Sequence, residues 1–164
     1  MPDYRIRVAS IADADALVAH RLGMFSDMGT PMNAEAVARA FRAWLEQAMP
    51  SGLYRAWVIE TREQTIVAGG GITVLPWPPG PRDLGDRLAF VYNVYVNPGH
   101  RGRGLARRLM ETIHASCREQ GISSIALNGS DAGRRLYDSL GYHVSPNPMM
   151  FLALEHSDPT LSRL

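Results

Sequence analysis

The sequence predicts a mixed α/β protein in which a sheet of about seven strands is flanked by about four helices. The chain has 164 residues, the usual length of one domain, so we expect a single domain over residues 1–164. Its composition, 46% hydrophobic and 20% charged, is that of a globular protein and excludes intrinsic disorder. Segments with alternating and with helical apolar spacing follow in the order β-α-α-β-β-β-α-β-α-β-β, which is not a regular βαβ repeat.

The first third of the chain is expected to form one strand and two helices. Tyr4–Val8 alternates apolar and charged residues, as a half-buried strand does. Ser10 and Asp13 have the spacing of a capping box, with aspartate in place of glutamate, at the start of a helix. Asn33 can cap a second helix over Ala34–Ala48, which carries apolar residues on one side.

The middle of the chain predicts three strands. Arg55–Thr61 and Thr65–Val74 are joined by a short connection and should form an antiparallel hairpin. The proline-rich segment 76–81 is expected to be a rigid loop, because proline lacks the backbone donor that a sheet needs. Leu88–Val96 is β-branched or aromatic almost throughout and gives the strongest strand prediction.

The last third predicts two helices and three strands. Apolar residues recur every four positions in Gly102–Gln120, which indicates a long helix. A short strand at Ile125–Leu127 and a helix at Asp131–Leu140 follow. The last two strands are expected near Tyr142–Val144 and Met150–Leu154.

Composition excludes several classes of function. Seventeen basic and sixteen acidic residues leave a formal charge of +1, so bulk charge gives no reason to bind nucleic acid or an anionic membrane. The single cysteine, Cys117, excludes an intramolecular disulfide and a cysteine-based zinc site, and we expect it to pack inward. No apolar run approaches the roughly 20 residues that span a bilayer. We therefore expect a cytoplasmic protein with no metal, no membrane and no nucleic acid among its partners.

Residues 94–106 carry the most informative functional pattern. A strand ends at Asn97, a glycine-rich turn follows, and a long helix opens. Glycines let backbone N–H groups crowd together, and a helix N-terminus adds about half a positive charge. Arg101 and Arg103 stand at the same turn, where basic residues are unfavourable unless an anion binds. The pattern therefore predicts an anion site.

Two common phosphate-binding motifs are absent from this sequence. A P-loop needs a lysine, and the chain has none. A Rossmann fingerprint starting at Gly102 would need glycine or alanine where Arg107 stands. The remaining pattern, R-x-x-G-x-A over Arg101–Ala106, resembles the signature [Q/R]-x-x-G-x-[G/A] of the GCN5-related N-acetyltransferase (GNAT) family.

A second segment resembles the same family. Gly133–Tyr142 is similar to the family's A-x-x-L-Y-x-x-x-G-F segment, with Gly133 in place of alanine and Tyr142 in place of phenylalanine. Asn128, at the end of the preceding strand, is also a residue type that the family often has there. The order of elements agrees over about residues 4–154. The resemblance therefore implies a GNAT-like fold with a mixed, mostly antiparallel sheet.

The resemblance implies that acetyl-coenzyme A (acetyl-CoA) is the co-substrate and that amides of the glycine loop hold its pyrophosphate. Two diverging strands around Val94–Val96 and Ile125–Leu127 could admit the pantetheine arm, which would pair with exposed backbone. The expected cofactor-binding residues are Val94, Tyr95, Val96, Arg101, Gly102, Arg103, Gly104, Leu105, Ala106, Arg107 and Asn128.

Tyr137 is expected to be the general acid, because the resemblance implies that the tyrosine of the second motif protonates the departing thiolate. The alternative is an ordinary core tyrosine. No general base is assigned, since the strand Leu88–Asn93 contains no carboxylate. The groups left open are Tyr92, Asn93, a bound water, Asp27 and Glu46.

Selection of the acceptor is expected to come from the first two helices and the proline-rich loop. The candidate wall residues are Phe25, Met28, Trp77 and Tyr92. An aromatic residue at helical spacing is more often part of the core, whereas a tryptophan in a loop is as often functional.

The sequence predicts an N-acetyltransferase that moves an acetyl group from acetyl-CoA to a primary amine by direct attack in a ternary complex. The acceptor would be a small molecule or a peptide. The alternative is a non-catalytic acyl-CoA-binding sensor or regulatory module, because the central strand lacks a carboxylate. A nucleic-acid binder using the arginine-rich loop is disfavoured by the balanced charge. A homodimer is left open.

Overall fold

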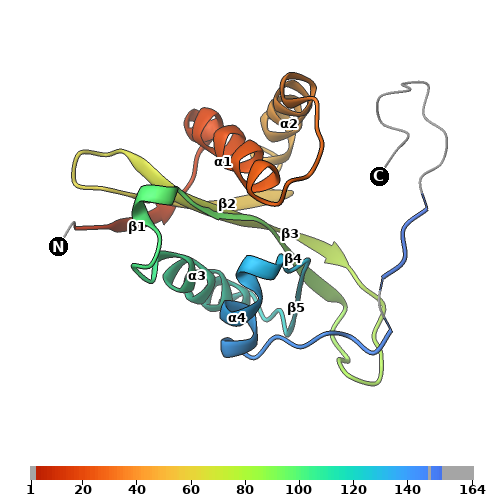
Figure 1. Ribbon diagram of the computed structural model, residues 1–164. Helices are drawn as coiled ribbons and strands as arrows, with labels where there is room; N and C mark the ends of the chain where they lie inside the picture. Colours follow the sequence, from red (N-terminus) through yellow and green to blue (C-terminus); the bar gives the residue numbers. More distant parts are fainter. Residues whose placement is uncertain (1–2, 148, 153–164) are drawn as a thin grey trace. The chain divides into compact units, whose positions relative to one another are not determined.

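The computed structural model describes residues 3–147 and 149–152, which form two compact units that meet in sequence at Ser130 and Asp131. The first unit contains a five-stranded sheet in the order β1-β2-β3-β4-β5 (Figure 1). Its strands are β1 (Arg5–Val8), β2 (Tyr54–Glu60), β3 (Ile66–Pro76), β4 (Arg87–Val96) and β5 (Ser124–Leu127). The helices are α1 (Ala14–Asp27), α2 (Ala34–Ala48), α3 (Leu105–Glu119) and, in the second unit, α4 (Asp131–Ser139).

The sheet is mixed and mostly antiparallel, as predicted. β1, β2, β3 and β4 pair antiparallel in turn, and β5 pairs parallel to β4. A parallel neighbour needs a crossover connection, and α3 supplies it between β4 and β5. The predicted hairpin of the second and third strands is confirmed, with Tyr54 opposite Thr73 at one end.

The described residues form five strands rather than about seven. Residues 142–147 and 149–152 contain no strand, and residues 153–154 of the last predicted strand lie outside the described residues. The chain after α4 closes the helix end instead of pairing, because the amide of Tyr142 donates to the carbonyl of Tyr137 at 3.0 Å. Gly141 makes this closure possible with a φ of 91°, in the left-handed region.

The predicted caps place the two N-terminal helices. The backbone amide of Ser10 donates to Oδ2 of Asp13 at 2.8 Å, as a capping box requires. Asn33 accepts from the amide of Ala36 at 3.0 Å and starts α2 where the sequence predicts. A 3-10 turn, Ile11–Asp13, precedes α1.

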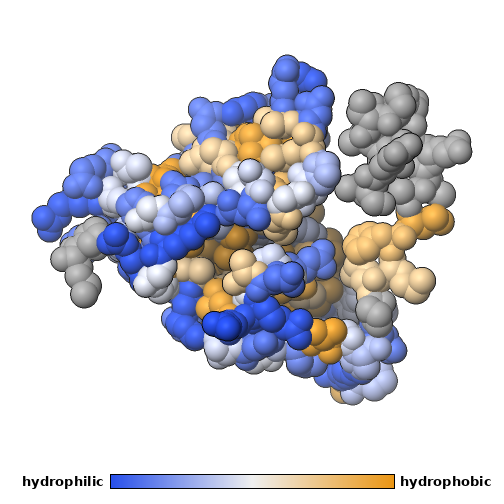
Figure 2. Space-filling view, in the orientation of Figure 1, coloured by the Kyte–Doolittle hydropathy of each residue, from blue (hydrophilic) through white to orange (hydrophobic). Residues whose placement is uncertain are grey.

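Helices α1 and α2 cover one face of the sheet, and α3 covers the other (Figure 1). The core on the first face joins Leu17 and Val18 of α1, Phe41 and Leu45 of α2, and Tyr54 of β2. On the second face, α3 buries Leu109 and Ile113 completely, together with Cys117. The expectation that Cys117 packs inward is confirmed. Figure 2 shows apolar residues gathered between α1 and α2.

Candidate functional site

A bulge in β4 is the feature that opens the sheet. Gly69 faces Tyr95 and Gly71 faces Tyr92, so Gly70 alone faces two residues, Asn93 and Val94. Asn93 has a φ of 57°, in the left-handed region, which a non-glycine residue adopts rarely. A bulge bends its strand and increases the local twist.

The bulge lies where β4 and β5 separate. The two strands pair only from Leu88 to Val91 on β4, against Ser124 to Leu127 on β5. β4 continues to Val96, and no described strand pairs with that end on the β5 side. An extended chain of an acyl carrier could therefore add to the backbone at Val94–Val96.

The turn between β4 and α3 presents backbone amides at the start of a helix. Gly102 and Gly104 have φ angles of 73° and 75°, and between them they hold the turn in a left-handed, concave shape. In the described part of the chain, the amides of Gly102 to Ala106 donate to no protein acceptor. A Cβ at either glycine would meet nothing within 4 Å, so the loop faces open space. These donors and the helix dipole suit an anion such as a pyrophosphate.

The same glycines correct the predicted start of the long helix. The sequence predicts a helix from Gly102, whereas α3 begins at Leu105. Left-handed residues cannot belong to a right-handed helix, so the first three residues form the loop instead.

Arg101 contacts protein groups rather than the open side of the loop. Its Nε donates to the carbonyl of Val96 at 2.8 Å, and its Nη2 forms an ion pair with Asp27. The guanidinium also lies over the ring of Tyr95, 5.3 Å from the centroid. Arg101 therefore fastens the end of α1 to the end of β4. Arg103 stays within the turn, where Nη2 approaches the carbonyl of Gly99 at 3.4 Å.

Small residues bring α1 close to the sheet beside the bulge. A Cβ at Gly23 would lie 2.6 Å from the hydroxyl of Tyr95, and one at Gly71 would lie 2.5 Å from the ring of Tyr54. Real Cβ atoms do not approach so closely, so larger residues at these positions would displace α1 or Tyr54. Gly71 thus leaves room for the Tyr54 ring beside β3, and Gly23 lets α1 approach Tyr95.

A polar cluster occupies this close approach. Nη1 of Arg21 on α1 donates to Oδ1 of Asn93, and Nδ2 of Asn93 donates to the hydroxyl of Tyr54 at 3.4 Å. Next to it, Oγ1 of Thr73 donates to the hydroxyl of Tyr92 at 3.4 Å. Burial lowers the pKa of Arg21 and raises the pKa of Tyr54 to about 12. We call these five residues the Arg21 cluster.

The structure brings two of the four predicted wall residues to this cluster. The ring of Phe25 lies 4.9 Å from the guanidinium of Arg21, and Tyr92 belongs to the cluster itself. Met28 and Trp77 are 44% and 46% exposed, at the end of α1 and after β3. In the described residues neither makes a ring contact or a side-chain hydrogen bond with the cluster.

The carboxylates considered as general bases have other surroundings. Asp27 pairs with Arg101, and Glu46 is exposed. The two buried carboxylates of the described residues, Asp13 and Glu60, both pair with Arg7 at 2.8 Å. The hydrogen bond from Arg7 lowers the pKa of Asp13. The general base therefore stays unassigned.

Tyr137 lies on α4, in the second unit, and is half-buried. Its ring meets that of Tyr142 edge-on, with centroids 5.8 Å apart, and burial raises its pKa. A Cβ at Gly133 would lie 2.6 Å from the Tyr137 ring. Glycine in place of the family's alanine therefore leaves room for this ring position. Within residues 131–147 and 149–152, the Tyr137 hydroxyl makes no hydrogen bond.

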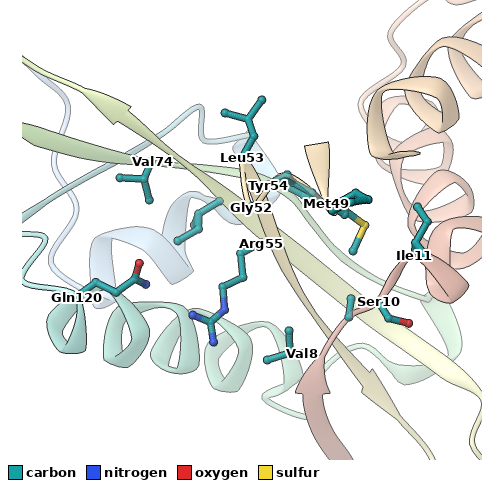
Figure 3. Close-up of a pocket in the computed structure, with 13 residues that line it drawn as sticks. Val8, Ser10, Ile11, Met49, Gly52, Leu53, Tyr54, Arg55, Val74 and Gln120 are labelled. Atoms are coloured by element: carbon teal, nitrogen blue, oxygen red, sulfur yellow. The ribbon is translucent and has the colours of Figure 1, made fainter. Parts of the chain in front are cut away.

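A separate hollow of about 550 Å³ lies at the open edge of β2, where β1 ends (Figure 3). Val8 and Ile11 line one side, and Val74 and Gln120 line another, with Arg55 between them. None of the predicted site residues is among its described lining. Tyr54 of the Arg21 cluster also lines this hollow, whereas the free amides of Gly102 to Ala106 are not part of it.

The described residues offer neither a metal-binding cluster nor a membrane-crossing helix. Among residues 3–147 and 149–152, no three His, Cys, Asp or Glu side chains are grouped to hold a metal ion. No helix in the same residues has the length and apolar character that crossing a membrane requires.

Comparison with known proteins identifies the family. The model of the acetyltransferase (GNAT) family matches residues 24–142. This protein belongs to the GNAT acetyltransferase family. The resemblance drawn from the two motifs is thereby confirmed, as is the prediction of an acyltransferase at the level of the family.

Solved structures show the same fold. A GCN5-related N-acetyltransferase from Ralstonia eutropha JMP134 is 31% identical, with a TM-score of 0.82 over 92% of this chain and 99% of that one. A predicted acetyltransferase from Clostridium acetobutylicum, solved with acetyl-CoA, is 24% identical, with a TM-score of 0.84 over 95% and 100% of the two chains. At that identity the second likeness shows the fold alone.

Curated relatives match a shorter stretch. Human N-acetyltransferase 8B is 29% identical over 89 residues, which are 52% of this chain and 37% of that protein. The chloroplastic serotonin N-acetyltransferase 2 of Oryza sativa subsp. japonica is 35% identical over 78 residues, 46% of this chain and 39% of that protein. The match thus covers less than two fifths of either relative.

Proposed function

We propose that this protein transfers an acetyl group from acetyl-CoA to a primary amine by direct attack in a ternary complex. The observation that carries the proposal is the loop of free amides at the start of α3. This loop directly follows the end of β4 that has no partner strand on the β5 side. The family supports acetyl-CoA as donor, and a structural neighbour was solved with it. The acceptor would be a small molecule or a peptide.

The donor would bind along β4 and its following loop. Amides of Gly102 to Ala106 would donate to the pyrophosphate, and the backbone of Val94–Val96 would pair with the pantetheine arm. Arg103, Arg107 and Asn128 would add side-chain contacts. Arg101 would hold the loop in place through Val96 and Asp27, which is a positioning role.

The reaction needs a nucleophile, a leaving group and two proton transfers. The amine nitrogen would attack the thioester carbonyl, the C–S bond would break, and the thiolate would take a proton from Tyr137. The amine proton would pass to a base that stays unassigned, with Tyr92, Asn93, a bound water, Asp27 and Glu46 left open. The role of Tyr137 rests on its motif position.

A non-catalytic sensor of acyl-CoA is the second candidate, because no carboxylate stands in the Arg21 cluster. The two candidates differ in turnover. We expect release of free CoA thiol from acetyl-CoA when a panel of primary amines is added, above the rate without amine. Binding of acetyl-CoA with no amine-dependent release would identify a sensor. Failure to bind acetyl-CoA would contradict both.

We also propose that the protein acts in the cytoplasm, where acetyl-CoA would be at hand. The absence of a membrane-crossing helix among the described residues agrees with this but does not carry it. Fractionation of cells that express the full-length protein tests the placement. We expect the protein with the cytoplasmic fraction, and recovery with membranes would contradict the proposal.

A further inference from the structure

Arg21 is a half-buried cation that has no acidic partner among the described residues. Its guanidinium lies between the rings of Phe25 and Phe41, 4.9 and 4.7 Å from their centroids. Its one hydrogen-bond partner in the described residues is the amide oxygen of Asn93. No described carboxylate pairs with it. Charges shielded from water in proteins are normally paired. A bound anionic ligand would therefore supply the counter-charge that Arg21 lacks.

Arg7, in the same unit, is another half-buried arginine and can be compared with Arg21. The Arg7 side chain is 31% exposed, and it has two carboxylate partners, Asp13 and Glu60, both at 2.8 Å. Hydrogen bonds to these acids raise the pKa of Arg7, whereas burial lowers that of Arg21. The fold therefore supplies counter-charges to one guanidinium and none to the other.

The free edge of the Arg21 guanidinium fits a carboxylate. Nη1 is used by Asn93, whereas Nε and Nη2 donate to no acceptor in the described residues. These two nitrogens form one side of the planar group and can donate in parallel to two oxygens. Arg21 is the only cation in its cluster, which suits a single negative charge better than a phosphate dianion.

The position of Arg21 in the fold suggests that its ligand is the acceptor. Asn93 is the bulge residue and precedes Val94, where the open end of β4 would receive the acyl donor. An anion held by Arg21 would therefore lie beside the acyl group, where the attacking amine must also be. The phenols of Tyr54 and Tyr92 stand nearby, and the pKa of Tyr54, about 12, keeps it neutral.

We propose that Arg21 binds a carboxylate of the acceptor, so that the substrate class is amines that carry a carboxylate, such as amino acids. This inference rests on the proposed acetyl transfer. It makes Arg21 the residue that selects the acceptor, with Asn93 holding the guanidinium in position and the two phenylalanine rings shielding it from water.

The test compares matched acceptors on the wild-type protein. α-Amino acids, β-alanine and γ-aminobutyrate are each assayed beside their primary amides, with CoA thiol release as readout. We expect the best acid to exceed its amide at least about tenfold in kcat/KM, as a bidentate charge-assisted contact provides. Amides that equal or exceed their acids would overturn the proposal, and this comparison needs no variant to fold.

Substitution then assigns the preference to Arg21. Arg21→Gln should raise KM for the acids about 10- to 100-fold and leave the amides nearly unchanged. Arg39→Gln, which removes an exposed arginine from a surface pair with Glu35, should change neither. A preference for acids that survives Arg21→Gln in folded protein would exclude Arg21 as its source.

A binding measurement separates this proposal from the acetyl transfer on which it rests. N-acetylalanine and N-acetylalaninamide are the products expected from alanine and its amide. Each is titrated against the CoA-bound protein, and binding is measured by thermal shift. If no amine releases thiol, the proposed function fails, but the acid should still bind more tightly than the amide to wild type and equally to Arg21→Gln. If wild-type protein bound N-acetylalanine and N-acetylalaninamide equally tightly, the carboxylate site would be excluded.

Discussion

Tyr137 offers a phenol that keeps its proton at neutral pH. Burial raises its pKa, and the edge-on contact with Tyr142 fixes the ring. We expect Tyr137→Phe to lower acetyl transfer about 10²- to 10⁴-fold, the usual contribution of a general acid, because the ring packing stays and only the hydroxyl is lost. The dissociation constant of acetyl-CoA should barely change, since the hydroxyl acts mainly in the transition state.

A matched variant controls for disturbance of α4. Tyr142→Phe removes a hydroxyl from the ring partner of Tyr137 and should leave turnover within about twofold. Melting temperatures of both variants are measured on the assayed samples. Full activity in a folded Tyr137→Phe protein would show that Tyr137 is a packing residue and that another donor protonates the thiolate.

His20 makes the stability of the fold depend on pH. The side chain is 3% exposed, and in the described residues its Nδ1 has no hydrogen-bond partner. Burial lowers its pKa from 6.5 to about 4. Between these values the unfolded chain binds the proton and the folded chain does not, so stability is lost as the pH falls through this window. The loss reaches about 3 kcal/mol once the pH is below about 4.

Urea unfolding measured from pH 4 to pH 8 tests the role of His20, and His20→Met serves as the reference. We expect the variant to have the shallower dependence of unfolding free energy on pH, by about one proton at the steepest point. The exposed His143→Gln should behave as wild type does. Parallel curves for wild type and His20→Met would mean that His20 is protonated alike in both states.

At the scale of elements, β4 and its following loop combine two local devices. The bulge at Asn93 separates β4 from β5, and the left-handed glycines turn the chain so that amides face open space. β4 thus carries Tyr92 and Asn93 of the Arg21 cluster in its middle and leads into the amide loop at its end. β4 therefore contributes to both the proposed donor site and the proposed acceptor site, whose Arg21 comes from α1.

The loop can be tested with a pair of glycines that have the same backbone. Gly104 and Gly52 both have a φ of 75°, and a Cβ on either meets nothing within 4 Å. Glutamate should strain each by roughly 1–2 kcal/mol. Only Gly104→Glu adds a negative charge beside the free amides, so it alone should weaken CoA binding, by about 100-fold or more. Calorimetric titration measures this, and equal affinity in both variants would remove the loop from the CoA site.

Local patterns explain why most elements could be predicted. The cap at Asn33, the hairpin of β2 and β3, and the alternation in β1 involve residues close in sequence. The last two predicted strands, which the described part of residues 142–154 does not form, rest on apolar composition. Such composition is ambiguous, because it does not say whether a partner strand is within reach.

The two parts of the candidate site differ in how far sequence could predict them. The amide loop follows from neighbouring glycines and arginines, so the pattern predicted where it lies. Arg21 and Tyr54 were missed, because they meet Asn93 from 72 and 39 positions away in the chain. The only sequence signal for them is the glycine run in β3. It indicates that another group packs closely against the strand, but it does not identify the side chain. Arg101 pairs with Asp27 in the structure, and its expected contact with the cofactor stays a prediction.

For the whole molecule, family membership and the open loop support one account of function. The GNAT family model covers residues 24–142, which include β4, its loop and α4. Family membership predicts a CoA site, and the free amides of the loop predict that the pyrophosphate supplies much of its affinity. Binding of CoA at the loop can therefore be tested before the acceptor amine is known.

The most direct test is calorimetric titration of the full-length protein with CoA and, separately, with pantetheine, which lacks the pyrophosphate. We predict one CoA site per chain and a rise in melting temperature at saturation, by mass action. Pantetheine should bind about 100-fold more weakly or worse, because it leaves the loop amides without an anion and also lacks the 3′-phosphoadenosine of CoA. No heat and no thermal shift with saturating CoA, or equal binding of pantetheine, would contradict the account.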